Sequence, residues 1–171
     1  LDRFFSAWRG LGGAAHDDFQ RSDTLASTQE LASAINRTAQ DFREAQEAAD
    51  DEIVRGIQVA NELIDEIAGL NREIMEDEAY GDDANELRDR RDLLAGRLGD
   101  LVGATYFVNN KDHMIVTLSG GLGVVSGVET QNLEAELDVA TGFHDVVIAG
   151  GSNMSVKDTM ASGRLKGFLT V

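Results

Sequence analysis

The sequence predicts an α+β protein in which a long antiparallel α-helical coiled hairpin or bundle is followed by a small β-rich domain. Three observations lead to this fold class. Apolar residues recur every three or four positions over most of the first 102 residues, and no proline interrupts them. After Gly103 the pattern changes to short apolar runs that are separated by glycines, as in strands joined by turns. The length of 171 residues suits one domain or two small units.

The predicted helical arm covers residues 1–102 and contains three helices, at about 1–11, 22–76 and 83–102. The long middle helix has an apolar stripe that is rich in alanine at first and in isoleucine and leucine from Ile53 onward. Such a stripe over several heptads is typical of coiled-coil packing. The first helix has an apolar face, which we expect to pack in a core or an interface and which consists of Leu1, Phe4, Phe5, Trp8 and Leu11.

The second and third helices should form an antiparallel pair, because only the short acidic turn at 77–83 separates them. Asp83 is the expected N-cap of the third helix, and Glu86 lies three residues later, as in a capping box. Residues at equal distances from the turn should then meet. The expected partners are Leu87, Leu94, Leu98 and Leu101 on the third helix and Ile74, Leu70, Ile67 and Leu63 on the second.

Arg91 interrupts this leucine stripe, at the position that would divide the seven-residue step between Leu87 and Leu94. The spacing makes it face the second helix rather than solvent. Counting back from the turn places Leu70 and Asn71 nearest to it. The sequence therefore predicts a charged residue on an apolar seam.

An arginine on such a seam needs a carboxylate partner or must extend its aliphatic stem towards water. The first possibility for Arg91 is a bridge to Glu66, to Glu73 or to the neighbourhood of Asp92, which would fix the register of the hairpin. The second is a half-exposed arginine that contributes well under about 1 kcal/mol to stability. The sequence leaves both open.

The remaining residues, 103–171, form the predicted small β-rich domain. Asn109 and the three residues after it are expected to form a turn between the first two strands. The expected strands cover residues 105–108, 114–118, 122–125, 133–137, 146–149 and 165–171.

A search for catalytic and ligand-binding patterns yields no catalytic residue, no cofactor and no metal site. There is no cysteine, which excludes thiol catalysis and cysteine-ligated zinc. His16, His113 and His144 stand apart from one another, and none belongs to a metal-binding motif. The glycine-rich stretch at 119–126 lacks the third glycine and the following helix of a dinucleotide-binding loop. The acidic turn at 77–83 lacks EF-hand spacing.

The chain is strongly acidic, with a formal net charge of -16. Residues 103–171 hold 7 acidic and 4 basic residues, so most of the negative charge lies in the helical arm. Such a surface repels phosphate backbones, and we expect no nucleic-acid partner. No apolar run approaches the roughly 18 to 20 residues that a membrane helix needs, and we expect no membrane partner.

Four segments, in the same order along the chain, resemble the flagellar hook-associated protein 1 family. The most specific is Asn85-Glu-Leu-Arg-Asp-Arg-Arg-Asp-Leu-Leu94, followed by Leu101-Val-Gly103. Upstream lies Ala60-Asn-Glu-Leu-Ile-Asp-Glu-Ile-Ala-Gly-Leu-Asn71, and downstream lie Gly120-Gly-Leu-Gly-Val-Val-Ser-Gly127 and Ser162-Gly-Arg-Leu-Lys-Gly-Phe-Leu169. The structural motif that the resemblance marks consists of Asn85, Leu87, Asp89, Arg91, Asp92, Leu94 and Gly103.

The resemblance implies a structural protein of the bacterial flagellum rather than an enzyme. In this family, copies form a ring that serves as an adaptor between the hook and the filament. The implied partners are other copies of the chain, the hook protein and the second junction protein, at an extracellular location reached by the flagellar type III route. The start, Leu1-Asp-Arg-Phe-Phe5, reads as the inside of a helix, so we expect an internal fragment of a longer protein.

Two other functions fit a long helical rod. A coiled-coil signalling module would have stronger seam residues than Ala32, Ala39 and Ala49, and it would leave the β-rich domain unexplained. A surface adhesin-like rod would use the β-rich domain for binding. The flagellar function remains the first expectation because it accounts for both parts of the chain.

Overall fold

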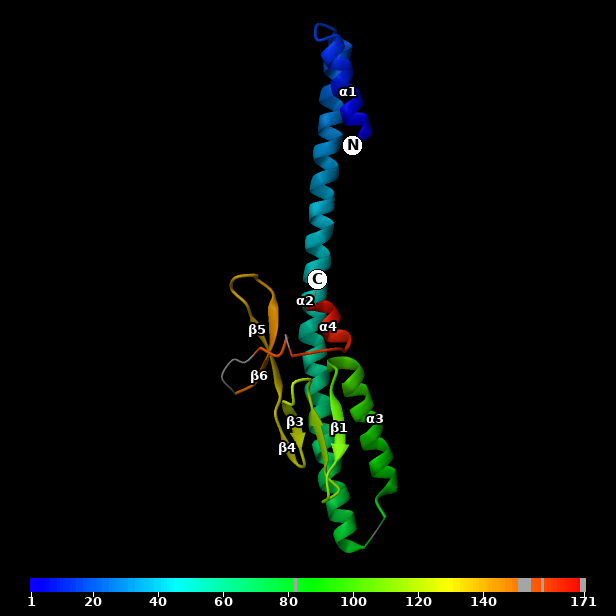
Figure 1. Ribbon diagram of the computed structural model, residues 1–171, viewed down its shortest axis with the longest axis vertical. Coiled ribbons are helices and arrows are strands. Elements are labelled where there is room, and N and C mark those ends of the chain that lie inside the picture. The colour runs from blue at the N-terminus through cyan, green and yellow to red at the C-terminus, as the bar shows by residue number, and fades with distance from the viewer. Residues whose placement is uncertain (82, 151–154, 158, 170–171) are drawn as a thin grey trace. The chain divides into compact units, whose positions relative to one another are not determined.

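The computed structural model contains four helices and six strands among the residues that it describes, which are 1–81, 83–150, 155–157 and 159–169 (Figure 1). The helices are α1 (Asp2–Gly13), α2 (Asp18–Tyr80), α3 (Asn85–Val102) and α4 (Arg164–Phe168). The strands are β1 (Thr105–Val108), β2 (Met114–Thr117), β3 (Gly123–Ser126), β4 (Glu129–Thr130), β5 (Leu133–Leu137) and β6 (His144–Ile148). The α+β class that the sequence predicts is confirmed.

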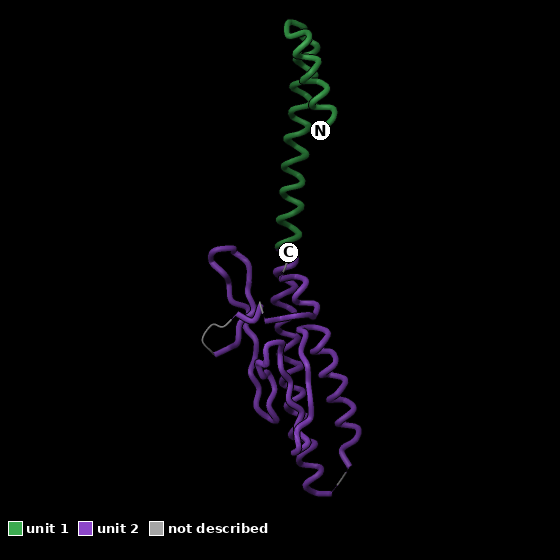
Figure 2. The backbone as a smooth tube through the Cα atoms, in the orientation of Figure 1, with its two compact units in different colours: residues 1–46 green, residues 47–171 purple. Residues whose placement is uncertain are grey.

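The chain divides into two compact units, residues 1–46 and residues 47–171, and the boundary falls within the residues of α2 (Figure 2). These units follow packing, whereas the predicted division into 1–102 and 103–171 follows secondary structure. The predicted division stays a prediction about domain organisation.

The first unit is a helical hairpin in which α1 lies beside the first turns of α2 (Figure 1). The Asp17 carboxylate accepts a hydrogen bond from the backbone N–H of Phe19 at 2.9 Å, so α2 begins four residues earlier than predicted. Thr24 Oγ1 donates to the backbone oxygen of Ala7 at 3.2 Å and is buried there. The expected burial of the apolar face of the first helix is only partial, because Trp8 is 57% exposed.

The second unit has one hydrophobic core, which the later part of α2, α3, α4 and both sheets share. Leucines from the predicted stripe of α3 pack in it together with residues of α2, and the stripes therefore meet as expected. The described core members from the helices include Ile53, Ile57, Ala60, Ile64, Ile67, Leu70, Leu94, Leu98, Leu101 and Leu165.

The strands form two antiparallel sheets, one of four strands in the order β1-β2-β3-β4 and one of two strands, β5-β6. The chain from 129 to 137 takes part in both sheets. The N–H of Gln131 donates to Val124 of β3 at 2.9 Å, and the carbonyl of Asn132 accepts from Ala149, also at 2.9 Å. Successive residues of a strand direct their backbone groups to opposite sides, so β3 and β6 lie on opposite edges of this segment.

Two predictions from the sequence are wrong. The expected strand at 165–171 is the helix α4, because Leu165 is followed by Phe168 and Leu169 at helical rather than alternating spacing; residues 170 and 171 lie outside the described residues. Asp83 does not cap α3, whose N-cap is Ala84 without a side-chain hydrogen bond. Since the N-cap lies one residue later than predicted, Glu86 is the second residue of the helix and is not in capping-box register. Strand β4 was not expected at all.

The contact between α2 and α4 gives a first prediction. A Cβ atom at Gly56 would lie 2.4 Å from Cδ2 of the buried Leu165, whereas a Cβ atom at Gly69 would meet no atom within 4 Å. Gly56→Ala is expected to lower the free energy of unfolding by about 1–2 kcal/mol, because overpacking outweighs the gain in helix propensity. Gly69→Ala should raise it by about 0.5–1 kcal/mol. Urea unfolding of both variants measures the difference, and equal effects would contradict the close α2–α4 contact.

Candidate functional site

The centre of the second unit is a buried polar cluster around Asn71 of α2, which is 1% exposed. Its amide Nδ2 donates to the backbone oxygens of Met114 at 3.0 Å and Gly127 at 2.7 Å. Its Oδ1 accepts from the backbone N–H of Met114 at 3.0 Å and from Arg91 Nη1 at 2.9 Å. A single side chain thus connects α2 with α3, with the start of β2 and with the turn between β3 and β4.

Arg91 lies in this cluster and is 2% exposed. Its Nη1 donates to Asn71 Oδ1 at 2.9 Å and to the backbone oxygen of Asp112 at 3.1 Å. Within the described part of the chain no carboxylate pairs with it, so the expected bridge to Glu66, Glu73 or the Asp92 neighbourhood is wrong. The alternative of a half-exposed arginine is also wrong, because neutral amide and carbonyl oxygens replace the water that its head group would otherwise need.

Burial lowers the pKa of the Arg91 guanidinium from its ordinary value, and the nearby negative charges of Asp92 and Asp112 oppose this shift. Its Nε is buried and has no hydrogen-bond partner among the residues that the structure describes. A buried charged group with an unpaired donor is costly to fold. Arg91 itself is therefore expected to add little to stability, although its hydrogen bonds connect α3 with Asn71 of α2 and with Asp112.

Arg88 lies one turn before Arg91 on α3 and binds the turn between β1 and β2 closer to the protein surface. Its guanidinium pairs with Glu78 of α2 and with the Asp112 carboxylate, to which its Nε donates at 3.0 Å. Its hydrogen bond with Asp112 raises the pKa of Arg88 above its ordinary value. Asp112 has a φ of 61°, an uncommon conformation outside glycine that aspartate tolerates in turns. The carboxylate and the carbonyl of one turn residue are thus bound by two arginines of α3.

Two further polar residues of α2 bind the backbone of the two-stranded sheet. Asn61 Nδ2 donates to the backbone oxygen of Leu133 at 2.8 Å, and its Oδ1 accepts from the N–H of the same residue at 2.8 Å. It thereby satisfies the edge of β5 as a neighbouring strand would. The Asp50 carboxylate accepts from the backbone N–H of His144 at 2.6 Å and lies 2.7 Å from its ring Nδ1.

The Asp50–His144 contact predicts that alanine substitutions of Asp50 and of its neighbour Asp51 change the free energy of unfolding by different amounts. Asp50→Ala should lower the free energy of unfolding by about 1–3 kcal/mol, because it leaves the backbone N–H at the start of β6 without its partner. Asp51 is exposed, and Asp51→Ala should change it by no more than about 0.5 kcal/mol. Thermal unfolding of both variants tests this, and an equal loss would show that charge rather than the backbone contact is responsible.

The end of α3 lies against the segment that leads into α4. Gly103 is the C-cap residue, with a φ of 71°, and a Cβ atom there would lie 2.4 Å from the backbone oxygen of Ser162. Gly163 approaches equally closely, since its Cβ would lie 2.5 Å from the nitrogen of Gly103. Two segments that the sequence marks separately, at 101–103 and 162–169, therefore meet in space.

The seven residues of the predicted structural motif divide into a buried and an exposed group. Arg91 and Leu94 are buried, Leu87 packs at the edge of the core, and Gly103 ends the helix. The other three are exposed on α3: Asn85, whose Oδ1 lies 3.4 Å from Arg88 Nη1, Asp89 and Asp92. Their shared role as one motif stays a prediction.

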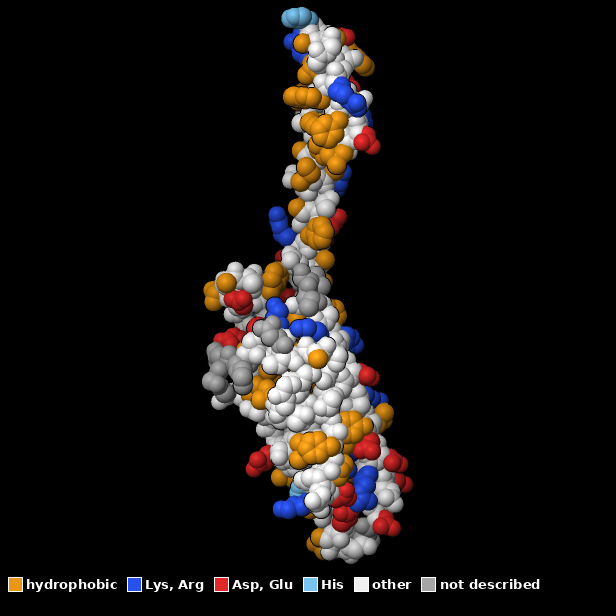
Figure 3. All heavy atoms as spheres, viewed as in Figure 1, with side chains coloured by type: hydrophobic (Ala, Val, Ile, Leu, Met, Phe, Trp, Pro, Cys, Tyr) orange, Lys and Arg blue, Asp and Glu red, His pale blue; other side chains and the backbone are white. Residues whose placement is uncertain are grey.

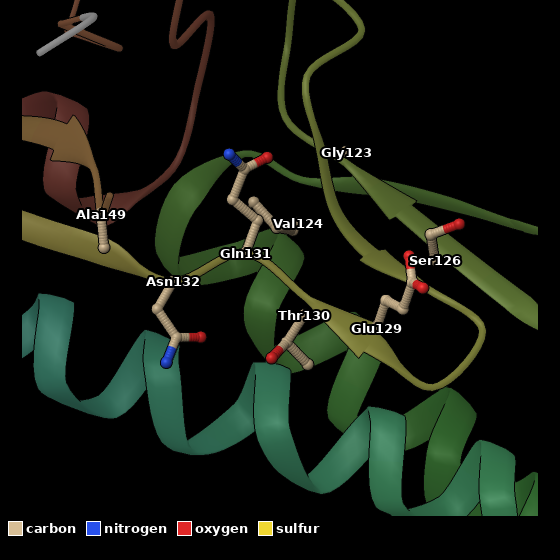
Figure 4. A pocket seen from close by; sticks show the side chains of 8 residues that line it. All are labelled: Gly123, Val124, Ser126, Glu129, Thr130, Gln131, Asn132 and Ala149. Carbon is tan, nitrogen blue, oxygen red and sulfur yellow. The ribbon is translucent and has the colours of Figure 1, made fainter. Parts of the chain in front are cut away.

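A polar pocket of about 520 Å³ lies where the segment at 129–132 passes from one sheet to the other (Figure 4). Thr130 and Asn132 point towards α2, drawn in teal, and Gln131 points away from it (Figure 4). Asn132 Oδ1 is buried without a hydrogen-bond partner among the described residues. The lining has no histidine and only Glu129 as a charged residue, so it does not form an acid–base pair.

Neither a metal cluster nor a membrane span is found in the described part of the chain. No three histidine, cysteine, aspartate or glutamate side chains gather there closely enough to bind a metal ion. None of the described helices combines the length and the apolar character that crossing a bilayer requires.

Comparison with known proteins identifies the family to which this arrangement of helices and sheets belongs. A family model described as the flagellar hook-associated protein FlgK helical domain matches residues 1–171. The chain belongs to the FlgK helical-domain family. The family that the sequence motifs resemble is thereby confirmed, and it is a family of structural flagellar proteins.

Individual relatives agree with the family model. The chain is 23% identical to flagellar hook-associated protein 1 of Bacillus subtilis, over 99% of this chain and 36% of that protein. It is 26% identical to flagellar hook-associated protein 1 of Escherichia coli, over 79% of this chain and 25% of that protein. The flagellar hook junction protein FlgK from Burkholderia pseudomallei has the same fold, with a TM-score of 0.85 and 23% identity, over 98% of this chain and 31% of that one. The chain thus spans between a quarter and just over a third of the length of these relatives.

Sequence reasoning missed the central residue of the cluster. The sequence places Asn71 near Arg91 and includes Asn61 and Asn71 in a segment that resembles the family, but it predicts no hydrogen-bond partners for them and does not single out Asp50. The available signal is that Asn61 and Asn71 stand in a helix whose neighbouring positions are apolar. An asparagine at such a position has to find hydrogen bonds inside the core, and backbone groups of strands can provide them.

Proposed function

We propose that this chain is part of a structural component of the bacterial flagellum, an adaptor at the hook–filament junction that assembles as a ring of copies. The match of the FlgK helical-domain model to all 171 residues carries the proposal. The polar cluster supports it, because Asn71 and Arg91 bind backbone groups of the same chain and connect its helices with its strands. Such bonds fix the positions of the segments relative to one another, as a structural protein requires.

The partners follow from the position in the flagellum. The hook protein lies on one side, the second junction protein on the other, and further copies lie within the ring. The protein works outside the cell, as part of the appendage, after export by the flagellar type III route. It is not an enzyme and acts by transmitting force between two assemblies.

Immunogold electron microscopy of intact flagellated cells tests this function, with an antibody raised against the chain. The expected result is a narrow band of label where the hook meets the filament. Label on the cell body or in the cytoplasm, with none at the junction, would overturn the proposal. In that case the surface adhesin-like rod or the coiled-coil signalling module would take its place.

A further inference from the structure

A groove of about 320 Å³ lies between α2, the end of α3 and the start of α4. Its floor is apolar and includes Val59, which is 44% exposed although it belongs to a helix that packs in the core. Two arginines and one aspartate also line it. The lining residues are Val59, Leu63, Arg97, Asp100, Leu101 and Arg164.

The charge of this groove contrasts with that of the chain. The formal net charge is -16, yet the groove carries two arginines and a single carboxylate. Arg97 and Arg164 are exposed, and neither forms an ion pair with a residue that the structure describes. Arg88 and Arg90 of the same helix α3, in contrast, are paired with Glu78 and Glu66. A groove that is lined by apolar residues and by unpaired arginines suits an apolar side chain that is flanked by carboxylates.

A surface of this kind lies at the other end of the same helical hairpin. Tyr80, the last residue of α2, is 88% exposed. Glu76 and Asp77 precede it by four and three residues, so they lie on the same face of the helix and are exposed as well. Several acidic side chains, with basic ones among them, lie on the part of the second unit near the turn between α2 and α3 (Figure 3). Tyrosine is among the residues that most often dominate the energy of an interface.

We propose that Tyr80 of one copy binds in the groove between α2, α3 and α4 of a second copy. The ring covers the apolar floor, Glu76 and Asp77 lie against Arg97 and Arg164, and the phenolic O–H donates to the Asp100 carboxylate. The partner is a second copy because the complementary charges and the exposed aromatic ring both belong to this chain. The inference rests on the proposed function, since it names the contact that joins copies.

The two halves of this contact lie at opposite ends of α3, whose 18 residues correspond to about 27 Å of helix. A contact between different patches of two identical chains is head-to-tail. Such contacts repeat from copy to copy and generate rings where the rotation closes, or filaments where it does not. The geometry therefore supplies an element that a ring of copies needs, and that a symmetric dimer through one patch would not supply.

Disulfide trapping tests the contact, because the chain has no cysteine of its own. Ala79→Cys places a thiol beside Tyr80, and Glu62→Cys places one beside the groove; both positions are exposed. The two variants are mixed and oxidised mildly, and a third variant, Val139→Cys, which lies in a loop and is 94% exposed, measures random pairing. We expect the mixed disulfide between Ala79→Cys and Glu62→Cys to exceed pairing with Val139→Cys severalfold.

Reversing the charges of the groove and of the residues near Tyr80 tests whether the mixed disulfide forms through this contact or through random collision. Arg97→Glu with Arg164→Glu, introduced into the Glu62→Cys chain, should reduce the mixed disulfide to the level of random pairing. Adding Glu76→Arg and Asp77→Arg to the Ala79→Cys chain should restore it. Arg37→Glu with Arg43→Glu changes the net charge equally at exposed positions outside the groove and should leave the yield unchanged.

A mixed disulfide no more abundant than pairing with Val139→Cys would overturn the contact, as would a yield that depends only on net charge. A symmetric disulfide between two Ala79→Cys chains as the main product would overturn the head-to-tail arrangement. The immunogold experiment separates this inference from the proposed function. Label at the junction without the mixed disulfide would support the proposed function and refute the contact. The mixed disulfide without label at the junction would support the contact and refute the proposed function.

Discussion

Asn71→Ala is expected to lower the free energy of unfolding by about 3–5 kcal/mol, among the largest effects of any single substitution in the chain. The variant leaves the N–H and the carbonyl of Met114, the carbonyl of Gly127 and Arg91 Nη1 without their common partner. Each buried group that loses its partner costs about 1–3 kcal/mol, and partial relaxation reduces the sum. Urea unfolding monitored by far-UV circular dichroism measures the loss.

Asn85→Ala is the matched control, since Asn85 is exposed on α3 and makes only a long contact with Arg88. It should change the free energy of unfolding by less than about 0.5 kcal/mol. The double variant Asn71→Leu with Arg91→Leu removes both polar partners at once. Because the two residues share a hydrogen bond, its loss should be smaller, by about 1–3 kcal/mol, than the sum of the losses measured for Asn71→Leu and for Arg91→Leu separately. Additive losses would mean that Arg91 and Asn71 stabilise the fold independently.

The same substitution tests whether the polar cluster specifies a unique structure. A buried polar group can fix register at a cost in stability, and an apolar replacement can then be more stable but less specific. If Asn71→Leu with Arg91→Leu melts no lower than the unsubstituted chain and remains a single species, the cluster has no such role. If it populates several oligomers, specificity is the reason that Arg91 stands in the leucine stripe.

The sequence predicts helices and strands well where the apolar residues of a segment recur at one regular spacing. The helices α1, α2 and α3 and the strands at 105–108 and 133–137 appear at or near the expected residues, because each has a local pattern of apolar residues that is typical of its type. The pairing of α2 with α3 follows from the short turn between them. The predicted neighbourhood of Arg91 and Asn71 is correct for the same reason.

The errors occur where distant segments decide the local structure. Arg91 could not be assigned its partners, because Asp112 lies 21 residues later and approaches only once the hairpin between β1 and β2 folds back. The helix α4 is too short to show its period, and it is positioned by Leu165 against Gly56, more than a hundred residues earlier. Such contacts have no local signature, so a single sequence does not reveal them.

The helix α2 nevertheless binds strands of both sheets in the second unit. Asp50, Asn61 and Asn71 lie along α2 and bind backbone groups at the starts of β6, β5 and β2, respectively. Side chains that bind backbone rather than other side chains fix where a strand begins while leaving the exposed faces of the sheets open to substitution. In this way three polar side chains of α2 hold both sheets to the long helix.

Gly103→Ala is the second substitution for which a large effect is expected, again about 3–5 kcal/mol lost from the free energy of unfolding. Two separate costs contribute. The φ of 71° places an alanine in the left-handed region, and its Cβ would lie 2.4 Å from the backbone oxygen and 2.8 Å from the carbonyl carbon of Ser162. Backbone atoms cannot rotate away as a side chain can, so the junction between α3 and the segment leading into α4 has to open.

Gly142→Ala separates these two costs. Gly142 has a φ of 78°, and a Cβ there would meet nothing within 4 Å. Gly142→Ala should therefore lower the free energy of unfolding only by the cost of placing an alanine in the left-handed region, about 1–2 kcal/mol. If both variants lose the same amount in urea unfolding, the close approach of Gly103 to Ser162 contributes nothing. If Gly103→Ala loses about 2 kcal/mol or more beyond Gly142→Ala, the glycine is required because another backbone segment lies against it, and the end of α3 cannot be substituted without displacing α4.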